Sequence, residues 1–280
     1  MRQTTGPRRA SARRLMGGGR SGLALLAACC VLALLLGYGA FRPSGPVAAA
    51  AQGTIAALPA PTGAAAAPSS EATPLVVVID AGHQAHANLR LEPIGPGSKT
   101  RKYKVSGGTS GRVTHAPESV INLRVALRLR DVLSDAGVTV VMVRTKQNVN
   151  IPNSQRAKIG NAARADLVVR IHCDGAARSI HGILMLVPKK NKWTGPIVAR
   201  SARAGRAILS ATLLTTGARN RGITPRSDMS GFNWSLVPSV LIEMGNMKNT
   251  KEDKLLSNAA YEQKLAKGIA QGVLAYAASR

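Results

Sequence analysis

Five short runs of the sequence are apolar almost throughout and rich in β-branched residues, which limits the folds open to the chain. They cover residues 75–80, 138–144, 166–172, 182–188 and 238–245. A strand that is apolar on both sides must be buried on both faces, as in a parallel sheet with helices on each side. The sequence therefore predicts a single α/β domain over residues 75–280, with a mostly parallel, twisted sheet of about five or six strands flanked by helices on both faces.

Residues 118–137 form an amphipathic stretch between two of these runs. Ile121, Val125 and Leu129 recur at helical spacing on one face, which predicts a helix that ends at Gly137. Further helices are expected from a cap at Asn153 or Ser154 to Arg164, over residues 196–216 and over residues 258–278.

The first 46 residues are basic and contain an apolar segment. They carry seven arginines and no acidic residue, and residues 21–41 hold no charge. About 20 apolar residues suffice to cross a bilayer, and a basic flank before an apolar run is typical of an export signal. A cleaved signal peptide and an uncleaved membrane anchor both fit this pattern, and both place the rest of the chain outside the cytoplasm, in the cell wall or secreted. Residues 47–74 are rich in alanine and proline, which predicts a flexible linker.

The chain is strongly basic, with 38 Lys and Arg against 13 Asp and Glu and a net charge of +25. Residues 1–74 hold seven arginines and one glutamate, so the predicted domain alone carries +19. Such a charge attracts anionic polymers, and outside the cytoplasm these are wall polymers or lipid headgroups. No nucleic-acid partner is expected, because only 3% of the residues are aromatic and no known binding motif is present. The plainer interpretation is a well-solvated surface. Two basic clusters are Arg200, Arg203 and Arg206 on one side of the 196–216 helix, and Lys189, Lys190 and Lys192 near it.

Polar side chains follow three of the predicted strands. His83 comes after the first run, His172 ends the third, and Glu243 lies in the fifth. Glu118 begins the long helix, which returns from the same edge of the sheet. Because the carboxyl ends of parallel strands meet at one edge, where α/β folds bind their ligands, we expect these four side chains to converge.

Two histidines and one glutamate are the ligand set of a catalytic zinc ion. With His83, Glu118 and His172 as ligands, a position stays open for water, whose pKa would fall to about 7. Glu243 would then accept a proton from that water as the general base.

Each candidate also has a plainer interpretation. A histidine after a strand is often only a hydrogen-bonded edge residue, and Glu118 could be a favourable charge at a helix N-terminus. Glu243 is harder to explain in this way, because an unpaired carboxylate in an apolar run is costly to bury. Cys173 could be a fourth ligand, but we favour a core thiol, since its side chain should point to the face opposite His172. Alternative ligands in loop-like stretches are His86, His115 and His181.

Five segments, in this order, carry a resemblance to a known family. They are IDAGH (79–83), GTSGRVTHAPESVINLRVALRLRDVL (108–133), RAKIGNAARADLVVRIHCDG (156–175), GITPRSDMSGFNWS (222–235) and VPSVLIEMGNMKNTKED (237–253). Through them the sequence resembles the zinc-dependent N-acetylmuramoyl-L-alanine amidases of the amidase-3 type, which are cell-wall hydrolases.

The resemblance implies one Zn²⁺ per domain and hydrolysis of the amide between N-acetylmuramic acid and L-alanine in peptidoglycan. By motif position it implies His83, Glu118 and His172 as ligands and Glu243 as general base. Two other functions are open on the same fold: a wall-binding or regulatory module with little turnover, and a zinc amide hydrolase or deacetylase acting on another part of the wall.

The sequence departs from the family pattern at three positions. Ala81 stands where proline is common, Cys173 where a small residue such as alanine is common, and Asn246 where phenylalanine is usual. Asn246 leaves open how the side chain of Glu243 is packed from behind.

Two long segments are expected near the predicted site. Residues 84–116 would either fold over the metal edge and shape the substrate groove, with a small hairpin, or form a surface excursion. Arg226, Asp228 and Trp234 lie in a second loop, where they would either line the groove and contact substrate or pair with each other.

Overall fold

The computed structural model describes residues 74–280. The predicted export signal or anchor and nearly all of the predicted linker lie outside the described residues. Within residues 74–280, no helix combines the length and the apolar character that a membrane span requires.

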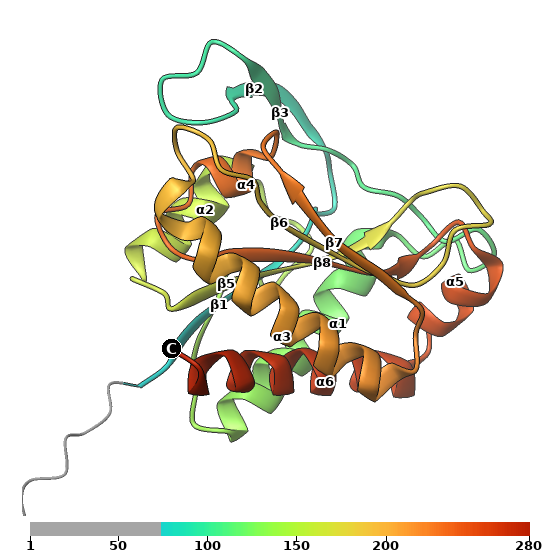
Figure 1. The fold of residues 1–280 in the computed structure, drawn as a ribbon. Coiled ribbons are helices and arrows are strands. Elements are labelled where there is room, and N and C mark those ends of the chain that lie inside the picture. The colour runs from blue at the N-terminus through green and yellow to red at the C-terminus, as the bar shows by residue number, and fades with distance from the viewer. Residues whose placement is uncertain (1–73) are drawn as a thin grey trace, which may run out of the picture. The chain divides into compact units, whose positions relative to one another are not determined.

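A six-stranded sheet forms the centre of the domain, in the order β4-β1-β5-β8-β6-β7 (Figure 1). In chain order the strands are β1 (Val76–Ala81), β4 (Thr139–Met142), β5 (Leu167–Asp174), β6 (Ile183–Pro188), β7 (Asn220–Arg226) and β8 (Ser239–Asn246). β4, β1, β5 and β8 are parallel, whereas β6 runs antiparallel to β8, and β7 pairs parallel with β6. The predicted α/β fold with a mostly parallel sheet is confirmed.

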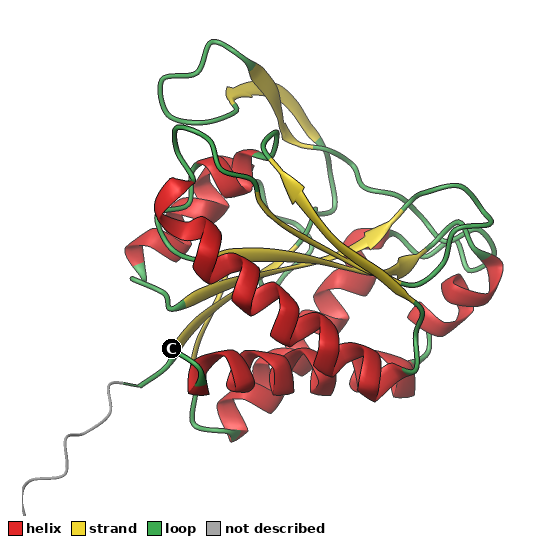
Figure 2. Cartoon of the chain, viewed as in Figure 1, coloured by secondary structure: helices red, strands yellow, loops and turns green. Residues whose placement is uncertain are grey.

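Helices cover both faces of this sheet (Figure 2). The long helices α1 (Glu118–Asp135), α3 (Val198–Thr216) and α6 (Ala259–Ala278) pack on one face, where they enclose the larger apolar core. The short helices α2 (Asn153–Ala162) and α4 (Ser230–Asn233) cover smaller clusters on the other face. α5 (Thr250–Leu256) follows β8, and a 3-10 turn, Gly195–Ile197, precedes α3.

The alternation of side chains along β5 separates the two faces chemically. Val169, Ile171 and Cys173 point into the larger core, and Cys173 is a buried core thiol, as favoured from the sequence. Arg170 and His172 therefore project from the opposite face. One face of the sheet thus serves burial, while the other carries charged and ligating groups.

A hairpin stands over the polar face. β2 (Asn88–Pro93) and β3 (Arg101–Val105) form a separate two-stranded antiparallel sheet within the long segment after β1. The hairpin expected in this segment is confirmed.

The N-terminus of α2 differs from the prediction that Asn153 or Ser154 caps it. The capping position is Pro152, which has no side-chain donor or acceptor. The carboxylate of Glu92 on β2 instead accepts hydrogen bonds from the backbone N–H and the hydroxyl of Ser154, at 3.1 and 2.6 Å. A residue 62 positions earlier supplies this cap, so local sequence could not reveal it. The end of α1 is as expected, because Gly137 follows it at φ 78°.

Helices α3 and α6 pack with their backbones in close contact. A Cβ atom added at Gly272 would lie 2.3 Å from the Cα of Ile208, and one at Gly268 would lie 2.7 Å from the Cα of Thr212. These glycines allow a helix crossing that any side chain would block.

We expect Gly272→Ala to destabilise the domain. In an exposed helix this change would stabilise by about 1 kcal/mol, but here the added methyl group meets backbone, and such overpacking costs about 1–3 kcal/mol. The measurement is the free energy of unfolding in urea. The control is Ala275→Gly on the exposed side of α6, which changes helix propensity without affecting the contact between α3 and α6. An alanine variant as stable as the wild type would contradict the close packing.

Candidate metal centre

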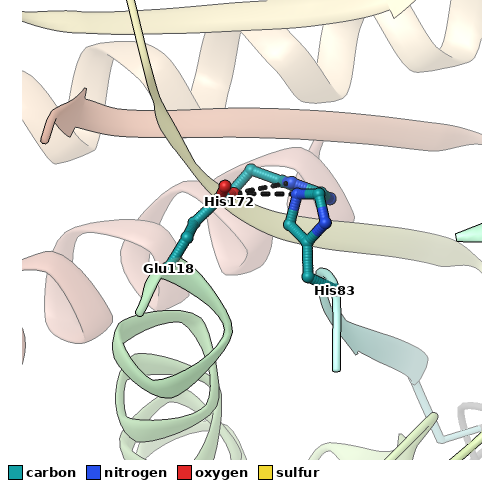
Figure 3. Close-up of side chains that lie close together, drawn as sticks. All are labelled: His83, Glu118 and His172. Carbon is teal, nitrogen blue, oxygen red and sulfur yellow. Dashed lines mark hydrogen bonds and ion pairs between the residues drawn. The ribbon is translucent and has the colours of Figure 1, made fainter. Parts of the chain in front are cut away.

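Three predicted residues meet at the carboxyl edge of the sheet (Figure 3). His83 follows β1, His172 lies near the end of β5, and Glu118 is the first residue of α1. Glu118 Oε1 is 3.2 Å from His83 Nε2 and 3.1 Å from His172 Nδ1. One ligand atom from each residue lies within 4.8 Å of the others, so the convergence expected from the strand ends is present.

The two imidazole rings are held in defined orientations. His83 Nδ1 lies 2.9 Å from the carbonyl oxygen of Ser106, so Nδ1–H donates there and Nε2 faces Glu118. The two rings are edge to face, with centroids 4.8 Å apart. A side chain at Gly82 would collide with the ring of His172, since its Cβ would lie 2.2 Å from Nε2. The glycine before His83 is therefore needed for the second histidine.

Hydrogen bonds fix the carboxylate of Glu118. Oε1 accepts from the backbone N–H of Cys173 and from Asn122 Nδ2, each at 3.2 Å, and Oε2 accepts from the N–H of Thr109 at 2.9 Å. Burial raises the pKa of Glu118, but hydrogen bonds from His172 and His83 outweigh it and hold the pKa well below its usual range. Burial also lowers the pKa of His172. At neutral pH these conditions favour a charged carboxylate and a neutral imidazole at His172, the protonation states that bind metal.

The donor set and spacing fit a zinc ion. Ligands at about 2.0–2.1 Å from a tetrahedral ion lie about 3.3 Å from one another, and the two distances to Glu118 are 3.2 and 3.1 Å. Nitrogen and oxygen donors of this kind suit zinc. Within residues 74–280 no further His, Cys, Asp or Glu joins the group. Three protein ligands with one position left over are typical of a catalytic site rather than a structural one.

Glu243 lies beside this group. It pairs in register with His172 across β8 and β5, and both residues line a pocket of about 280 Å³. Its Oε2 atom is buried and has no hydrogen-bond partner in the described part of the chain. Burial, followed by the nearby carboxylates of Glu118 and Asp174, raises the pKa of Glu243 well above its usual range. A carboxyl group in this environment can exchange a proton with a bound molecule.

The hairpin and α4 form the walls of this pocket. The remaining lining residues are Lys102, Tyr103, Val105 and Ser106 from the hairpin side, Asn153, Arg170 and Leu241 at the floor, and Met229, Ser230 and Gly231 at α4. The expectation that residues 84–116 shape a groove at the metal edge is confirmed.

A buried charge network lies beneath the centre. The carboxylate of Asp80 is 2.6 Å from Arg156 and 3.0 Å from Arg170, and all three side chains are almost fully buried. Arg156 also donates to the backbone carbonyls of Ala81 and His83, both at 2.9 Å. The guanidinium group thus holds the turn that carries the first histidine.

A third arginine joins this turn to α1. Arg144 donates to the carbonyl of Ala81 at 2.8 Å, that of Gly82 at 3.0 Å and that of Ser119 at 2.8 Å. Since Ser119 follows Glu118, Arg144 sets the distance between the carboxylate and the histidine turn.

These arginines were not among the predicted site residues, although the sequence contains a signal for them. Asp80 ends one apolar strand, and Arg170 interrupts another. Charges in buried strands require partners, and the alternation places both on the same face.

The other predicted residues lie outside the group of three. His86, His115 and His181 are exposed, and none of them joins the group of ligand atoms. Arg226 and Asp228 pair with each other at 2.7 Å, and neither lines the pocket, so a substrate contact for them stays a prediction.

Trp234 and Asn246 have structural partners. Trp234 donates from Nε1 to the carbonyl of Pro93 at 2.9 Å. Asn246 is fully buried, and its Nδ2 atom donates to the backbone carbonyls of Ala177 and Ile180 in the loop after β5. This position is therefore filled by a hydrogen-bonded amide.

Comparisons with known proteins agree on one family. Residues 77–275 match the Amidase_3 sequence family, described as N-acetylmuramoyl-L-alanine amidase. The chain is 32% identical over 234 residues to an N-acetylmuramoyl-L-alanine amidase of Mycobacterium tuberculosis, covering 80% of this chain and 95% of that protein.

Solved structures give the same result. The N-acetylmuramyl-L-alanine amidase Ami1 from Mycobacterium smegmatis is similar with a TM-score of 0.66 and 29% identity, over 74% of this chain and 98% of its own. An N-acetylmuramoyl-L-alanine amidase from Clostridium difficile is similar with a TM-score of 0.61 and 26% identity, over 75% of this chain and 100% of its own.

We expect the Asp80 network to make stability depend on acid pH. Burial raises the pKa of Asp80, but attraction by Arg170 and Arg156 outweighs it, and the pKa falls from 3.8 to about 2. The carboxylate then contributes about 2 kcal/mol above pH 4. That contribution is lost as the pH falls from about 4 toward 2, because the carboxyl becomes protonated.

Asp80→Asn should cost about 3–5 kcal/mol at pH 7, since it leaves two buried arginines without a counter-charge. The difference in the free energy of unfolding between the variant and the wild type, measured in urea, should become smaller below pH 4. Asp131→Asn, which removes an exposed pair with Arg130, should change little. A difference that stays constant from pH 7 to pH 3 would contradict the assigned ion pairs.

Proposed function

Because the chain belongs to the Amidase_3 family of N-acetylmuramoyl-L-alanine amidases, we propose that it hydrolyses the amide between N-acetylmuramic acid and L-alanine in peptidoglycan. The observation that carries the proposal is the convergence of His83, Glu118 and His172 beside the buried carboxyl group of Glu243. Family membership supports peptidoglycan amidase activity in general. The metal and the residue roles are our own assignments.

We assign His83, Glu118 and His172 as the ligands of one Zn²⁺ ion. The oxygen donor of Glu118 lies 3.2 and 3.1 Å from the two nitrogen donors, and all three ligand atoms lie within 4.8 Å of one another, which supports this assignment. When bound there, zinc supplies a Lewis acid for the scissile carbonyl and lowers the pKa of water to about 7. The contacts to Ser106 and Thr109 orient the ligands before the ion arrives.

We assign Glu243 as the general base and then the general acid. Its carboxylate accepts a proton from the attacking water, whose oxygen forms a bond to the carbonyl carbon. When the carbon–nitrogen bond breaks, Glu243 returns the proton to the departing amine of L-alanine. The products are a free lactyl carboxylate on the sugar and a free peptide amine. A raised pKa suits both steps, because the ideal pKa of an acid–base group lies near the working pH.

We expect Glu243→Gln to keep one zinc per domain and to lose turnover by about 10²–10⁴-fold, the usual contribution of general acid–base catalysis. His172→Ala should instead lose the metal and the activity together. The measurements are zinc content and digestion of purified peptidoglycan, with the new chain ends identified by mass spectrometry.

Four outcomes would contradict these assignments. Loss of zinc in the Gln variant would make Glu243 a ligand, and retained turnover would remove its role as base. Release of acetate, or of no product from the wild type, would indicate a deacetylase or a binding module with the same fold.

We also propose that the chain is exported and adheres to anionic wall polymers. The basic N-terminal pattern, which would hold the chain at the membrane if it is not cleaved, and the +19 charge of the domain support this proposal.

Adhesion to purified cell wall should weaken at least about tenfold between low and high salt, since exposed charges are screened beyond about 10 Å at 0.1 M salt. The measurement is a sedimentation assay with the full chain. Equal binding at both salt concentrations would contradict electrostatic adhesion.

A further inference from the structure

A cationic groove lies on the loops that neighbour the candidate metal centre in the sequence. Two hollows of about 890 and 720 Å³ share Arg112 and Arg178 in their walls, so they lie next to each other. We define the cationic groove by its five basic side chains, which are Arg112, Arg178, Arg219, Lys248 and Lys251.

The groove begins at the same loops that hold the metal centre. The N–H of Thr109 donates to Glu118, and the residues that follow, from Ser110 to Arg112, line the first hollow. Ala176 lines it from the loop after β5, four residues past His172. The loop before α1, the loop after β5 and α5 gather at one end of the sheet (Figure 1).

The charge in the groove is uncompensated. No ion pair of the described residues includes any of the five basic side chains. Both carboxylates in the adjoining helix α5 already bind the loops. Glu252 accepts from the N–H groups of Gly182 and Asn246, and Asp253 from those of Val113 and Thr114. The two carboxylates thus hold the walls of the groove in place. Lys248 Nζ donates to the carbonyl of Ser110 at 3.0 Å, and the two shared arginines remain without an ion-pair partner among the described residues.

The backbone of both shared arginines is fixed in place. The N–H of Arg112 donates to the carbonyl of Met247 at 3.0 Å, and Asn249 Nδ2 donates to the carbonyl of Arg178 at 2.9 Å. Asn246 Nδ2 donates to the carbonyls of Ala177 and Ile180, on each side of Arg178, at 2.9 and 2.8 Å. A loop ordered in advance loses less entropy when it binds a ligand.

The second hollow also has an apolar part. Leu255 is 45% exposed there and lies with Tyr261 among the lining residues. A ligand that carries both carboxylates and methyl groups would use the whole surface. A sugar phosphate polymer would leave the apolar part without a partner.

We propose that the cationic groove binds the stem peptide of the substrate, with Arg112 and Arg178 contacting its free carboxylates. This inference rests on the proposed amidase function. The sugars next to the scissile amide are neutral, whereas stem peptides combine alanine methyl groups with acidic residues. The peptide is therefore the part of the substrate that matches the groove, and the groove makes the enzyme selective for stem peptides whose carboxylates are not amidated.

The test compares two soluble muramyl peptides that differ only in free or amidated side carboxylates, with the full-length zinc-loaded chain. The wild type should have a kcat/KM about tenfold higher for the free acid, mainly through KM, because charged contacts of this kind are worth roughly tenfold or more. In the Arg112→Gln, Arg178→Gln double variant this ratio should fall close to one. The control is Lys264→Gln, Lys267→Gln on the exposed side of α6, which makes the same change in charge and should keep the wild-type ratio.

The outcomes separate this inference from the proposed function. If the wild type cleaves neither peptide at this bond, the amidase function fails. If it cleaves both equally, or if the double variant keeps the preference, the groove does not recognise the carboxylates of the stem peptide. The proposed amidase function is not affected by that result. Loss of binding to a purified phosphodiester wall polymer in the double variant, with the peptide preference unchanged, would assign the groove to that polymer and overturn the proposal.

Discussion

The shared carboxylate of Asp80 is the interaction on which the candidate site depends. Burying one carboxylate between two guanidinium groups gains little free energy over an apolar replacement of the same shape. What it provides is position, because Arg156 binds Asp80 and the carbonyls on both sides of Gly82 at once. His83 sits at φ 58°, a backbone conformation that costs energy for any residue other than glycine. The buried arginine supplies the contacts that keep it there, and it connects strand β1, helix α2 and the first histidine.

The two faces of the sheet have different roles: one packs against the apolar core, and the other carries the charged residues and His172. The larger apolar core lies under α1, α3 and α6, and it contains no residue of the candidate centre. The charged face holds Asp80, Arg170 and His172, covered by short helices and the hairpin. A shift of β5 by one residue would exchange these faces, placing the arginine in the apolar core and the cysteine at the metal edge. The apolar pattern of the strands therefore determines which side chains reach the centre as well as how the domain folds.

The sequence predicted those features that depend on local pattern. Apolar runs located five of the six strands of the central sheet, and the residues at their ends located His83, His172 and Glu243. Strand β7 was missed because NRGITPR is polar and lies at the sheet edge, where burial leaves no apolar pattern. The antiparallel direction of β6 and the cap on α2 from Glu92 depend on contacts between distant segments. The cationic groove could not be predicted from the sequence either, because it too depends on contacts between distant segments. Arg112 and Arg178 belong to separate loops, and the segment after β8 binds both of them.

Asn246 shows how a departure from the family pattern can connect catalysis to recognition. It lies three residues after Glu243 on the same strand, and its side chain is fully buried, so its amide group must be satisfied. The Nδ2 atom donates to the loop that carries Arg178, and Oδ1 accepts from the N–H of Lys248. The phenylalanine usual at this position would fill the space but could donate to neither carbonyl, and buried carbonyls without a donor are costly. One amide therefore connects the strand of the proposed base, Glu243, to the loop that carries Arg178 in the wall of the groove.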